Sequence, residues 1–393
     1  MQYSYSGNIS RLDSSLLKCA YSIYLGLTIF EFAFNDESGS LLKYFGFAII
    51  IFWFVCIVRG HLKIIINVPT KRLICWWIVL CISLLWSVNF STGFYYIYSI
   101  ANVLCLIIVA ENMYWDKKSI VSLLQTYSIA AMIMGIIVIA KGNLYHGVGI
   151  RYTIRLFGSE MDPNGISAYL SIPILIMLHF VLKKVKGWKI FVLGIIVCGY
   201  AMLLTGSRGG FVAILIGIIS FLLLDSFWSN KSISKVLWAI IIVFLLSGVL
   251  YYIITHFLGQ DIFIRLFNFD TYANDRGSER LDLWILALSY FIQSPIYGLG
   301  IASYGAITGY GIHNMYIDAL CDCGVFSFLF FIFSFFKIIT LHMRKKNALA
   351  VSMMFCMMTY IFFLDAYQKK FMWNVIIITI ILLQLNNSEG DLV

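Results

Sequence analysis

Apolar runs of about 20 residues recur from one end of this 393-residue chain to the other. Each run is long enough to cross the ~30 Å hydrocarbon core of a bilayer as a helix. The runs do not alternate between apolar and polar residues, which favours helices over a membrane β-barrel. Since 61% of the residues are hydrophobic and only 12% are charged, the chain cannot build a water-soluble surface. The sequence therefore predicts an all-α, polytopic integral membrane protein.

We predict about twelve transmembrane helices and one large loop, residues 259–313, between the ninth and the tenth. The second and the last run are short, so twelve is the best estimate. The predicted spans are 15–34, 44–58, 73–88, 94–110, 120–140, 165–182, 190–205, 211–227, 236–258, 314–341, 347–364 and 371–385.

Lysine and arginine residues predict the orientation of the chain. With both termini placed in the cytoplasm, the inward segments hold 17 Lys and Arg, and the outward segments hold ten. This distribution satisfies the positive-inside rule. The net charge of +9 lies in short loops beside the spans, so it reflects membrane topology and not nucleic-acid binding. The loop 259–313 and the segment 141–164 then face outward.

The outward basic residues differ in kind from the inward ones. Six of the ten are arginines, while the inward residues are mostly lysines. Topology needs only charge, whereas arginine adds a planar fork of donors suited to phosphate or carboxylate. These arginines therefore indicate an anionic ligand on the outer face; they are Arg151, Arg155, Arg208, Arg265, Arg276 and Arg280.

The large outer loop contains an amphipathic helix. Ser278 is a suitable N-cap and Pro295 marks the end of the helix. This helix, with Arg280 at its start, is expected to lie on the membrane surface or on the helix bundle. The glycine-rich stretch 297–311 follows, and is either a mobile loop that admits a bulky substrate or a linker. The apolar stripe of the helix comprises Leu281, Trp284, Ile285, Leu288, Phe291 and Ile292.

Polar side chains open the tenth predicted span. Asn314, Asp318 and Asp322 follow i, i+4, i+8 spacing and therefore share one helical stripe, with His313 at its start. Carboxylates inside a transmembrane helix normally face a polar cavity or a partner. A lone histidine at a helix end is usually structural, but beside an acidic stripe and opposite several arginines we favour a functional role.

Arg208 stands among glycines in "TGSRGG", at the start of the eighth predicted span. Backbone N–H groups and the positive dipole end of that helix point to the same place, so a phosphate would fit there. Gly206, Gly209 and Gly210 would clear space for its close approach. The alternative is an arginine that snorkels to lipid headgroups, beside glycines that serve a tight turn.

Four motifs follow one another along the chain: "DPNG" (162–165), "TGSRGG" (205–210), "ERLDLW" with "SPIYGLG" (279–300) and "HNMYIDALCDCG" (313–324). In this order they resemble the bacterial O-antigen polymerase and O-antigen ligase superfamily of polytopic glycosyltransferases. The resemblance covers roughly residues 150–330, and the first five spans are similar in hydropathy only.

The resemblance implies a glycan on undecaprenyl pyrophosphate as substrate, handled at the outer face of the bacterial inner (plasma) membrane. It places the family's pyrophosphate-binding arginines on Arg208 and Arg280, its essential histidine on His313, and its usual acidic residue on Asp322. It implies no cofactor, no essential metal and no nucleotide sugar. The expected partners are the lipid-linked glycan donor and acceptor, inner-membrane lipid and a chain-length regulator protein, but no nucleic acid. Further substrate-binding candidates are Arg151, Arg155, Arg276, Asn314 and Asp318.

We accordingly divide the chain into helices one to five (1–140), a catalytic core (141–345, helices six to ten with the loop 259–313) and two C-terminal helices (346–393). Paired arginines suit charge developing on a leaving phosphate, and His313 would deprotonate or only position the acceptor hydroxyl. A polymerase is favoured over a ligase because the motifs look closer to the polymerase branch. A flippase or other transporter is a third alternative, against which the long outer loop and the lack of an internal repeat both count.

Overall fold

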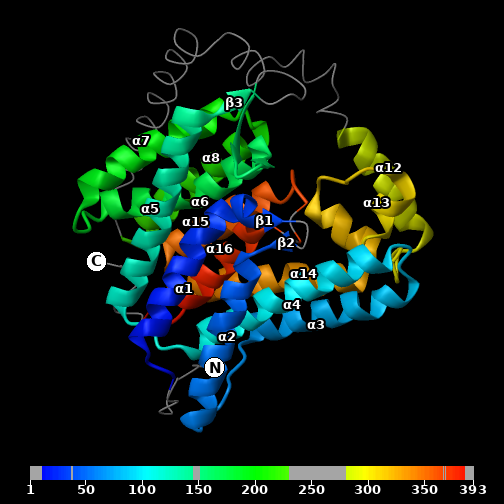
Figure 1. The fold of residues 1–393 in the computed structure, drawn as a ribbon, viewed down its shortest axis with the longest axis horizontal. Coiled ribbons are helices and arrows are strands. Elements are labelled where there is room, and N and C mark those ends of the chain that lie inside the picture. The colour runs from blue at the N-terminus through cyan, green and yellow to red at the C-terminus, as the bar shows by residue number, and fades with distance from the viewer. Residues whose placement is uncertain are drawn as a thin grey trace.

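The computed structural model describes residues 11–36, 39–144, 151–229, 280–365, 367 and 369–385. They form a bundle of helices (Figure 1), and eight of the helices in these residues are long and apolar enough to span a membrane. The all-α polytopic class is thus confirmed. These eight are α1 with η1 (Ser15–Phe34), α2 (Leu42–Arg59), α3 with η2 (Val68–Trp86), α4 (Phe90–Asn112), α5 (Lys117–Lys141), α6 (Pro163–Leu182), α8 (Arg208–Trp228) and α14 (Met315–Arg344).

Three further apolar helices are shorter: α7 (Trp188–Leu204), α15 (Ala348–Tyr360) and α16 (Lys370–Leu382). Every predicted span except 236–258, which lies outside the described residues, coincides with one of these eleven helices. The total of twelve therefore stays a prediction. The amphipathic helix of the large loop is present as α12 (Arg280–Gln293), followed by the short helix α13 (Ser303–Thr308).

Strands occur in two places where no strand was predicted. β1 (Asn35–Asp36) and β2 (Gly39–Ser40) form a minimal hairpin after η1. β3 (Asn143–Leu144), β4 (Tyr152–Leu156) and β5 (Ser159–Met161) form a three-stranded antiparallel sheet within the outward segment 141–164. Buried Ile154 pairs with Met161, so burial of one face holds this sheet to the bundle.

The tenth predicted span, 314–341, is not the single continuous helix that we expected. Gly324 has φ 73° and ψ −175°, which breaks α14 after Cys323. The chain before α13 fills the break: Val325 N–H donates to the Pro295 carbonyl, 2.9 Å. A Cβ on residue 324 would lie 2.2 Å from the Ile296 carbonyl oxygen, so only glycine fits this conformation. Backbone freed by the break is thereby hydrogen-bonded inside the protein, as a membrane requires.

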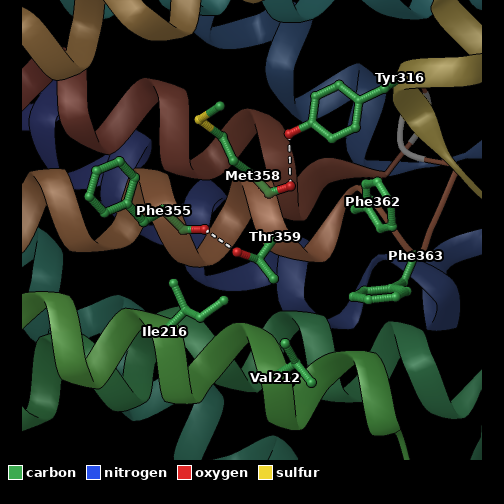
Figure 2. Close-up of a pocket in the computed structure, with 8 residues that line it drawn as sticks. All are labelled: Val212, Ile216, Tyr316, Phe355, Met358, Thr359, Phe362 and Phe363. Carbon is green, nitrogen blue, oxygen red and sulfur yellow. Dashed lines mark hydrogen bonds between the residues drawn. The ribbon is translucent and has the colours of Figure 1, made fainter.

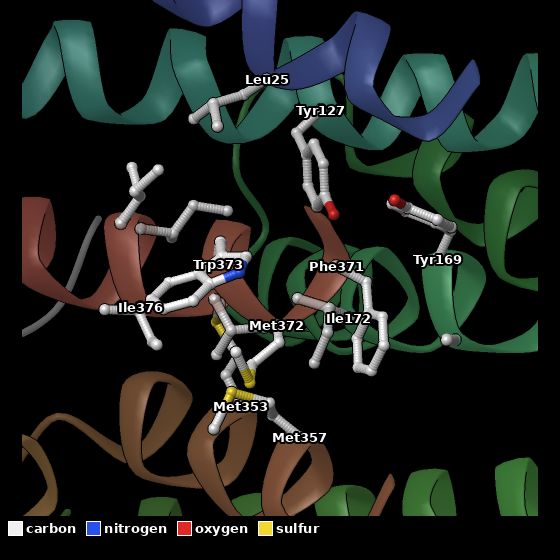
Figure 3. Packing of buried hydrophobic residues seen from close by; sticks show 14 of the residues in the cluster. Leu25, Tyr127, Tyr169, Ile172, Met353, Met357, Phe371, Met372, Trp373 and Ile376 are labelled. Atoms are coloured by element: carbon white, nitrogen blue, oxygen red, sulfur yellow. The ribbon is translucent and has the colours of Figure 1, made fainter. Parts of the chain in front are cut away.

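α16 lies at the centre of the bundle and is buried over nearly its whole length. Its Trp373 and Met372 pack against Met353 and Met357 of α15, and Tyr127 of α5 closes the same cluster (Figure 3). A helix that is apolar on every side is typical of a protein core or a membrane span.

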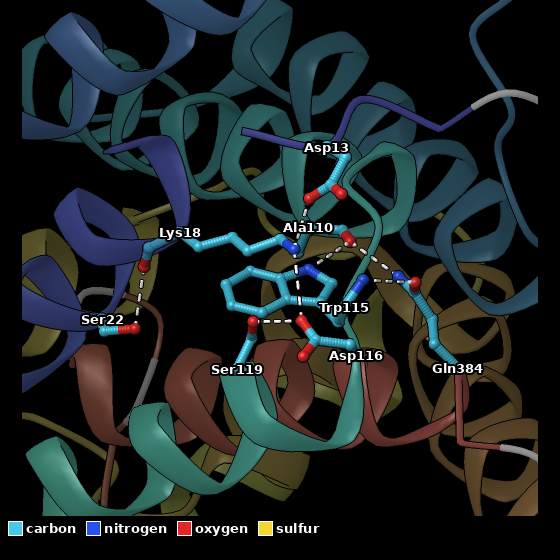
Figure 4. A network of polar contacts seen from close by, with 8 residues as sticks. All are labelled: Asp13, Lys18, Ser22, Ala110, Trp115, Asp116, Ser119 and Gln384. Atoms are coloured by element: carbon cyan, nitrogen blue, oxygen red, sulfur yellow. Dashed lines mark hydrogen bonds and ion pairs between the residues drawn. The ribbon is translucent and has the colours of Figure 1, made fainter. Parts of the chain in front are cut away.

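A polar network fixes one end of the bundle (Figure 4). Lys18 Nζ donates to Asp13, 2.6 Å, and to Asp116, 3.3 Å. The backbone N–H of Trp115 donates to the Gln384 side chain, 3.2 Å, which ties the loop before α5 to the chain after α16. α6, α8, α14 and α16 begin at the opposite end, which we call the site end.

Candidate functional site

Two helices begin side by side at the site end, and the motifs DPNG and TGSRGG cap them. Asp162 accepts hydrogen bonds from the backbone N–H groups of Asn164, 2.8 Å, and Gly165, 3.3 Å, at the start of α6. Ser207 accepts from Gly210 N–H, 3.3 Å, at the start of α8. The Ser207 hydroxyl also donates to the Asn164 side-chain oxygen, 2.9 Å. The two motifs are therefore linked by hydrogen bonds into one pair of adjacent helix N-termini.

Arg151 joins the same two motifs from the strand side. Its Nε donates to the Thr205 carbonyl, 3.0 Å, and its Nη2 donates to the Asn164 side-chain oxygen, 2.8 Å. Only 7% of Arg151 is exposed. These contacts let Arg151 hold the starts of α6 and α8 together, and its direct contact with substrate stays a prediction.

The glycines around Arg208 serve the turn and the packing of helices. Gly206 has φ 58° in the turn between α7 and α8. A Cβ at Gly209 would lie 2.9 Å from the Phe363 ring, and one at Gly210 would lie 2.0 Å from the Ser167 hydroxyl. Their neighbours thus occupy the space that we expected an anion to use. The case for an anion rests instead on Arg208 itself, half-buried at the first residue of α8.

His313 lies opposite an acidic residue that the sequence analysis missed. Its Nδ1 is 3.3 Å from the Asp365 carboxylate, which also accepts the Asn314 backbone N–H at 3.2 Å. His313 has φ 53° and its side chain is 51% exposed, so the ring is accessible at the surface of the site end. Asp365 lies between α15 and α16, fifty-two residues further along the chain.

α12 is held against the His313 segment by Trp284. The indole Nε1 donates to the Ile312 carbonyl, 3.0 Å, and the ring packs edge-on against Phe362 with centroids 5.1 Å apart. Arg280 lies one helical turn before Trp284 on the same face of α12. The apolar stripe predicted for this helix is largely exposed, and Ala287 is the residue buried against the bundle.

Residues 361–365 connect these parts. Met315 N–H donates to the Ile361 carbonyl, 2.9 Å, at the start of α14. Phe362 contacts Trp284 of α12, and Phe363 faces Gly209 beside Arg208. Asp365 contacts His313. The first turns of α8 and α12, which begin at Arg208 and Arg280, and His313 therefore all contact this one short segment.

The acidic stripe of α14 has structural contacts of its own. Asn314 caps the helix by accepting from Tyr316 N–H, 3.0 Å, and Ile317 N–H, 3.2 Å. Asp322 is buried and accepts from Ala302 N–H, 3.1 Å. Burial raises the pKa of the nearby Tyr367 hydroxyl well above its usual value, and the Asp322 and Asp318 carboxyls raise that pKa further. A substrate role for these residues stays a prediction.

The glycine-rich stretch 297–311 is packed into the bundle along part of its length. Gly300 N–H donates to the Asp322 carbonyl, 2.9 Å, and the Ile301 carbonyl accepts from the Ser87 hydroxyl, 2.6 Å. A Cβ at Gly298 would lie 2.5 Å from the Asp322 carbonyl group. Of the two alternatives left open, these contacts favour a structural connection over a mobile loop.

Arg155 lies apart from the other candidates. Its Nε donates to the Gly158 carbonyl in its own hairpin, 3.2 Å, and it faces Glu160 across the strand pair. It lines a cavity of about 510 Å³ together with Asn143 and Tyr152. Arg265 and Arg276 lie outside the described residues. Within the described ranges, no three His, Cys, Asp or Glu side chains are placed to hold a metal ion.

Residues 193–332 match the family model described as O-antigen ligase. The matched region contains Arg208, Arg280 and His313, and it confirms the resemblance to the O-antigen ligase and polymerase superfamily. That family implies glycosyltransferase-like chemistry on lipid-linked glycans at a membrane. The match includes neither the DPNG motif nor Asp365. A search of curated proteins finds no match to the chain.

Proposed function

We propose that the protein is an O-antigen polymerase. It transfers a glycan chain from undecaprenyl pyrophosphate to a lipid-linked repeat unit at the periplasmic face of the bacterial inner membrane. The observation that carries this proposal is that α8, which begins at Arg208, α12, which begins at Arg280, and His313 all contact residues 361–365, within and beside the region that matches the family model.

The arginines act on the leaving group. The reaction breaks the bond between the sugar C1 and the pyrophosphate oxygen, and negative charge develops on that oxygen. Forked N–H donors from Arg208 and Arg280 stabilise this charge, as does the positive end of the α8 dipole. Because Arg208 is the first residue of α8, its side chain and the helix N–H groups reach the same anion.

His313 acts on the acceptor. The Asp365 carboxylate faces Nδ1 and so leaves Nε2 free to take the proton of the acceptor hydroxyl. The hydroxyl oxygen then bonds to the sugar C1, while undecaprenyl pyrophosphate departs. Asp365 orients the imidazole and stabilises the imidazolium that forms, as a carboxylate does behind a catalytic histidine.

A ligase is the second candidate, because the matching model is described as O-antigen ligase. A ligase would transfer the finished chain to lipid A–core with the same groups in the same roles. Deleting the gene and separating lipopolysaccharide on a gel distinguishes the two activities. Core capped by a single repeat unit supports the polymerase. Bare core with accumulated lipid-linked polymer means a ligase. Loss of all surface units with accumulation in the cytoplasm would contradict both and indicate a flippase.

A further inference from the structure

One face of the sheet formed by β3, β4 and β5 lines a cavity of about 510 Å³, which we call the sheet cavity. Side chains alternate between the two faces of a strand, and the face that carries Ile154 and Met161 is buried against the bundle. The opposite face carries Asn143, Arg155 and Glu160, and all three line the sheet cavity. Its volume is typical of ligand sites, which measure about 300–1,000 Å³.

Four polar side chains in the sheet cavity have groups without a protein partner among the residues that the structure describes. The Asn143 amide, the Tyr152 hydroxyl and the Glu160 carboxylate make no hydrogen bond with those residues. Arg155 uses Nε for the Gly158 carbonyl, and its two terminal nitrogens make no bond to the described residues either. Arg155 and Glu160 are direct cross-strand partners, yet these two side chains form no ion pair. The sheet cavity therefore offers several donors and acceptors to a polar ligand.

A second cavity, of about 390 Å³ between α8 and α15, has a different lining (Figure 2). Its hydroxyl groups are already hydrogen-bonded within the protein. The Tyr316 hydroxyl donates to the Met358 carbonyl, 2.8 Å, and the Thr359 hydroxyl donates to the Phe355 carbonyl, 2.8 Å. The rest of its lining is apolar. Of these two cavities, the sheet cavity is the one that suits a ligand rich in hydroxyl groups.

The sheet cavity begins beside the helix start that carries Arg208. The Tyr152 ring lines the cavity and packs against the last two residues of α7, which are buried. Arg151, the neighbour of Tyr152, donates from Nε to the Thr205 carbonyl, 3.0 Å, in the turn between α7 and α8. The first residue of β4 is therefore held next to the turn that ends at Arg208, and the remainder of β4 leads away from it.

We infer that the sheet cavity binds the glycan of the donor while Arg208 binds the pyrophosphate of the same molecule; the inference rests on the proposed function. A sugar presents hydroxyl groups in fixed directions and an apolar ring face. An amide, a guanidinium and a carboxylate beside a tyrosine ring match both features. Tyr152 and Arg155 are three strand residues apart, which is about 10 Å at about 3.3 Å per residue. The first sugar thus stays near Arg208, and sugars further along the glycan reach Arg155 and Glu160.

The position of the sheet cavity favours the donor over the acceptor. The cavity is joined to the turn before Arg208, whereas His313, which we propose to act on the acceptor, contacts Asp365. A polymerase donor carries the growing chain, so a site along that chain holds it while the reacting bond stays at Arg208. Glu160 faces Arg155 and disfavours a second anion there. Arg155 therefore binds hydroxyl groups and not phosphate.

The test compares two Arg→Ala substitutions in the full-length protein in nanodiscs. Arg155→Ala removes donors from the sheet cavity, and Arg59→Ala removes an exposed arginine at the end of α2, outside the cavity. Each is assayed with a donor that carries several repeat units and with a donor that carries a single sugar. The lipid-linked acceptor is varied separately.

We expect Arg155→Ala to raise KM about tenfold for the long donor only, the lower end of the range for a charge-assisted hydrogen bond because the side chain is exposed. The kcat and the KM for the acceptor should stay the same, because the contact is equal in the ground state and the transition state. Arg59→Ala should change none of these values. An unchanged KM for the long donor in Arg155→Ala, or a rise in the acceptor KM alone, would overturn the inference.

Saturation-transfer NMR separates this inference from the proposed function, because it detects binding without transfer. The probe is the soluble oligosaccharide released from the lipid-linked donor. Saturation should pass from the wild-type protein to the sugar protons and be much weaker in Asn143→Ala and in Glu160→Ala. Such binding supports the sheet cavity even if no glycan is transferred. Binding that neither substitution weakens, or no binding to a protein that does transfer glycan, would reject it.

Discussion

At the scale of single residues, the most specific prediction concerns His313, the proposed proton acceptor. Replacing it with alanine removes the proton acceptor and should reduce polymer formation by about 10²–10⁴-fold. Membrane insertion should not change, because the side chain is half-exposed. His313→Gln keeps a hydrogen-bonding group that cannot accept a proton at neutral pH. Lipopolysaccharide gels should show no long chains in either variant; wild-type chain length with glutamine would mean that the histidine only positions the acceptor.

We expect glycan transfer to depend on the negative charge of Asp365. Asp365→Asn keeps the size of the side chain but removes the carboxylate that faces His313 Nδ1. A charge-assisted contact is worth about 1.5–3 kcal/mol, so transfer should slow by roughly 10–150-fold. The effect should appear in kcat, because Asp365 acts through the histidine. Asp13→Asn, the same change on an exposed side chain at the opposite end of the bundle, is the control. Equal loss of activity in both variants would contradict the pairing.

The two proposed phosphate ligands are tested by Arg→Lys substitutions. Arg208→Lys and Arg280→Lys keep the positive charge but lose the forked geometry. Each should lose roughly 10–150-fold in activity while the protein level in membranes stays the same. Transfer from a purified lipid-linked donor measures the loss. Full activity in both lysine variants would favour arginines that only snorkel to headgroups.

The sequence was informative about residues whose chemistry is unusual for their surroundings. Arg208 and His313 could be selected as candidates because charged or titratable side chains at the ends of apolar runs are costly to bury and often have a functional role. Asp365 could not be selected, because its partner lies fifty-two residues away and a single acid in a short loop is ordinary. A carboxylate on the side predicted to hold the arginines was the available signal. Only the folded chain shows that it faces His313.

At the scale of helices and strands, the close approach of α6, α8 and α15 depends on Gly210. A Cβ there would lie 2.0 Å from the Ser167 hydroxyl and 2.8 Å from the Tyr360 hydroxyl. Gly210→Ala should therefore destabilise the protein by about 1–3 kcal/mol through overpacking. Gly199→Ala on α7, where a Cβ meets nothing within 4 Å, is the matched control. Thermal unfolding in detergent should show a lower Tm for the first variant only; equal Tm values would contradict this packing.

Apolar length identified the described helices well, because a span must be continuously apolar. It could not identify the break in α14, because "CDCGVF" reads as helix interior and only contact with Pro295 and Ile296 requires the turn at Gly324. It also passed over β4, whose five residues are too few for a clear alternation. Such features depend on tertiary neighbours, which composition does not show.

At the scale of the whole molecule, the sequence gives no account of which helices are neighbours. Residues 361–365, from the C-terminal part of the chain, contact both α8 and α12 and so bring the candidate site residues together. This arrangement places Phe362, Phe363 and Asp365 next to motifs that come earlier in the chain. The site that we propose therefore includes residues outside the predicted catalytic core 141–345, which itself stays a prediction, and outside the residues that match the family model.

Every functional proposal depends on the orientation of the protein in the membrane, and this orientation can be measured directly. The Lys and Arg distribution predicts that both termini and Lys186 face the cytoplasm, and that Gly305 in α13 faces the periplasm. A single cysteine placed at residue 305, in a background without the nine native cysteines, should react with a membrane-impermeant maleimide in whole cells. A cysteine at residue 186 should react only after the membrane is opened. Because Gly305 and His313 are both in the stretch between α12 and α14, the reverse pattern would place the site on the cytoplasmic side and contradict the proposed transfer at the periplasmic face.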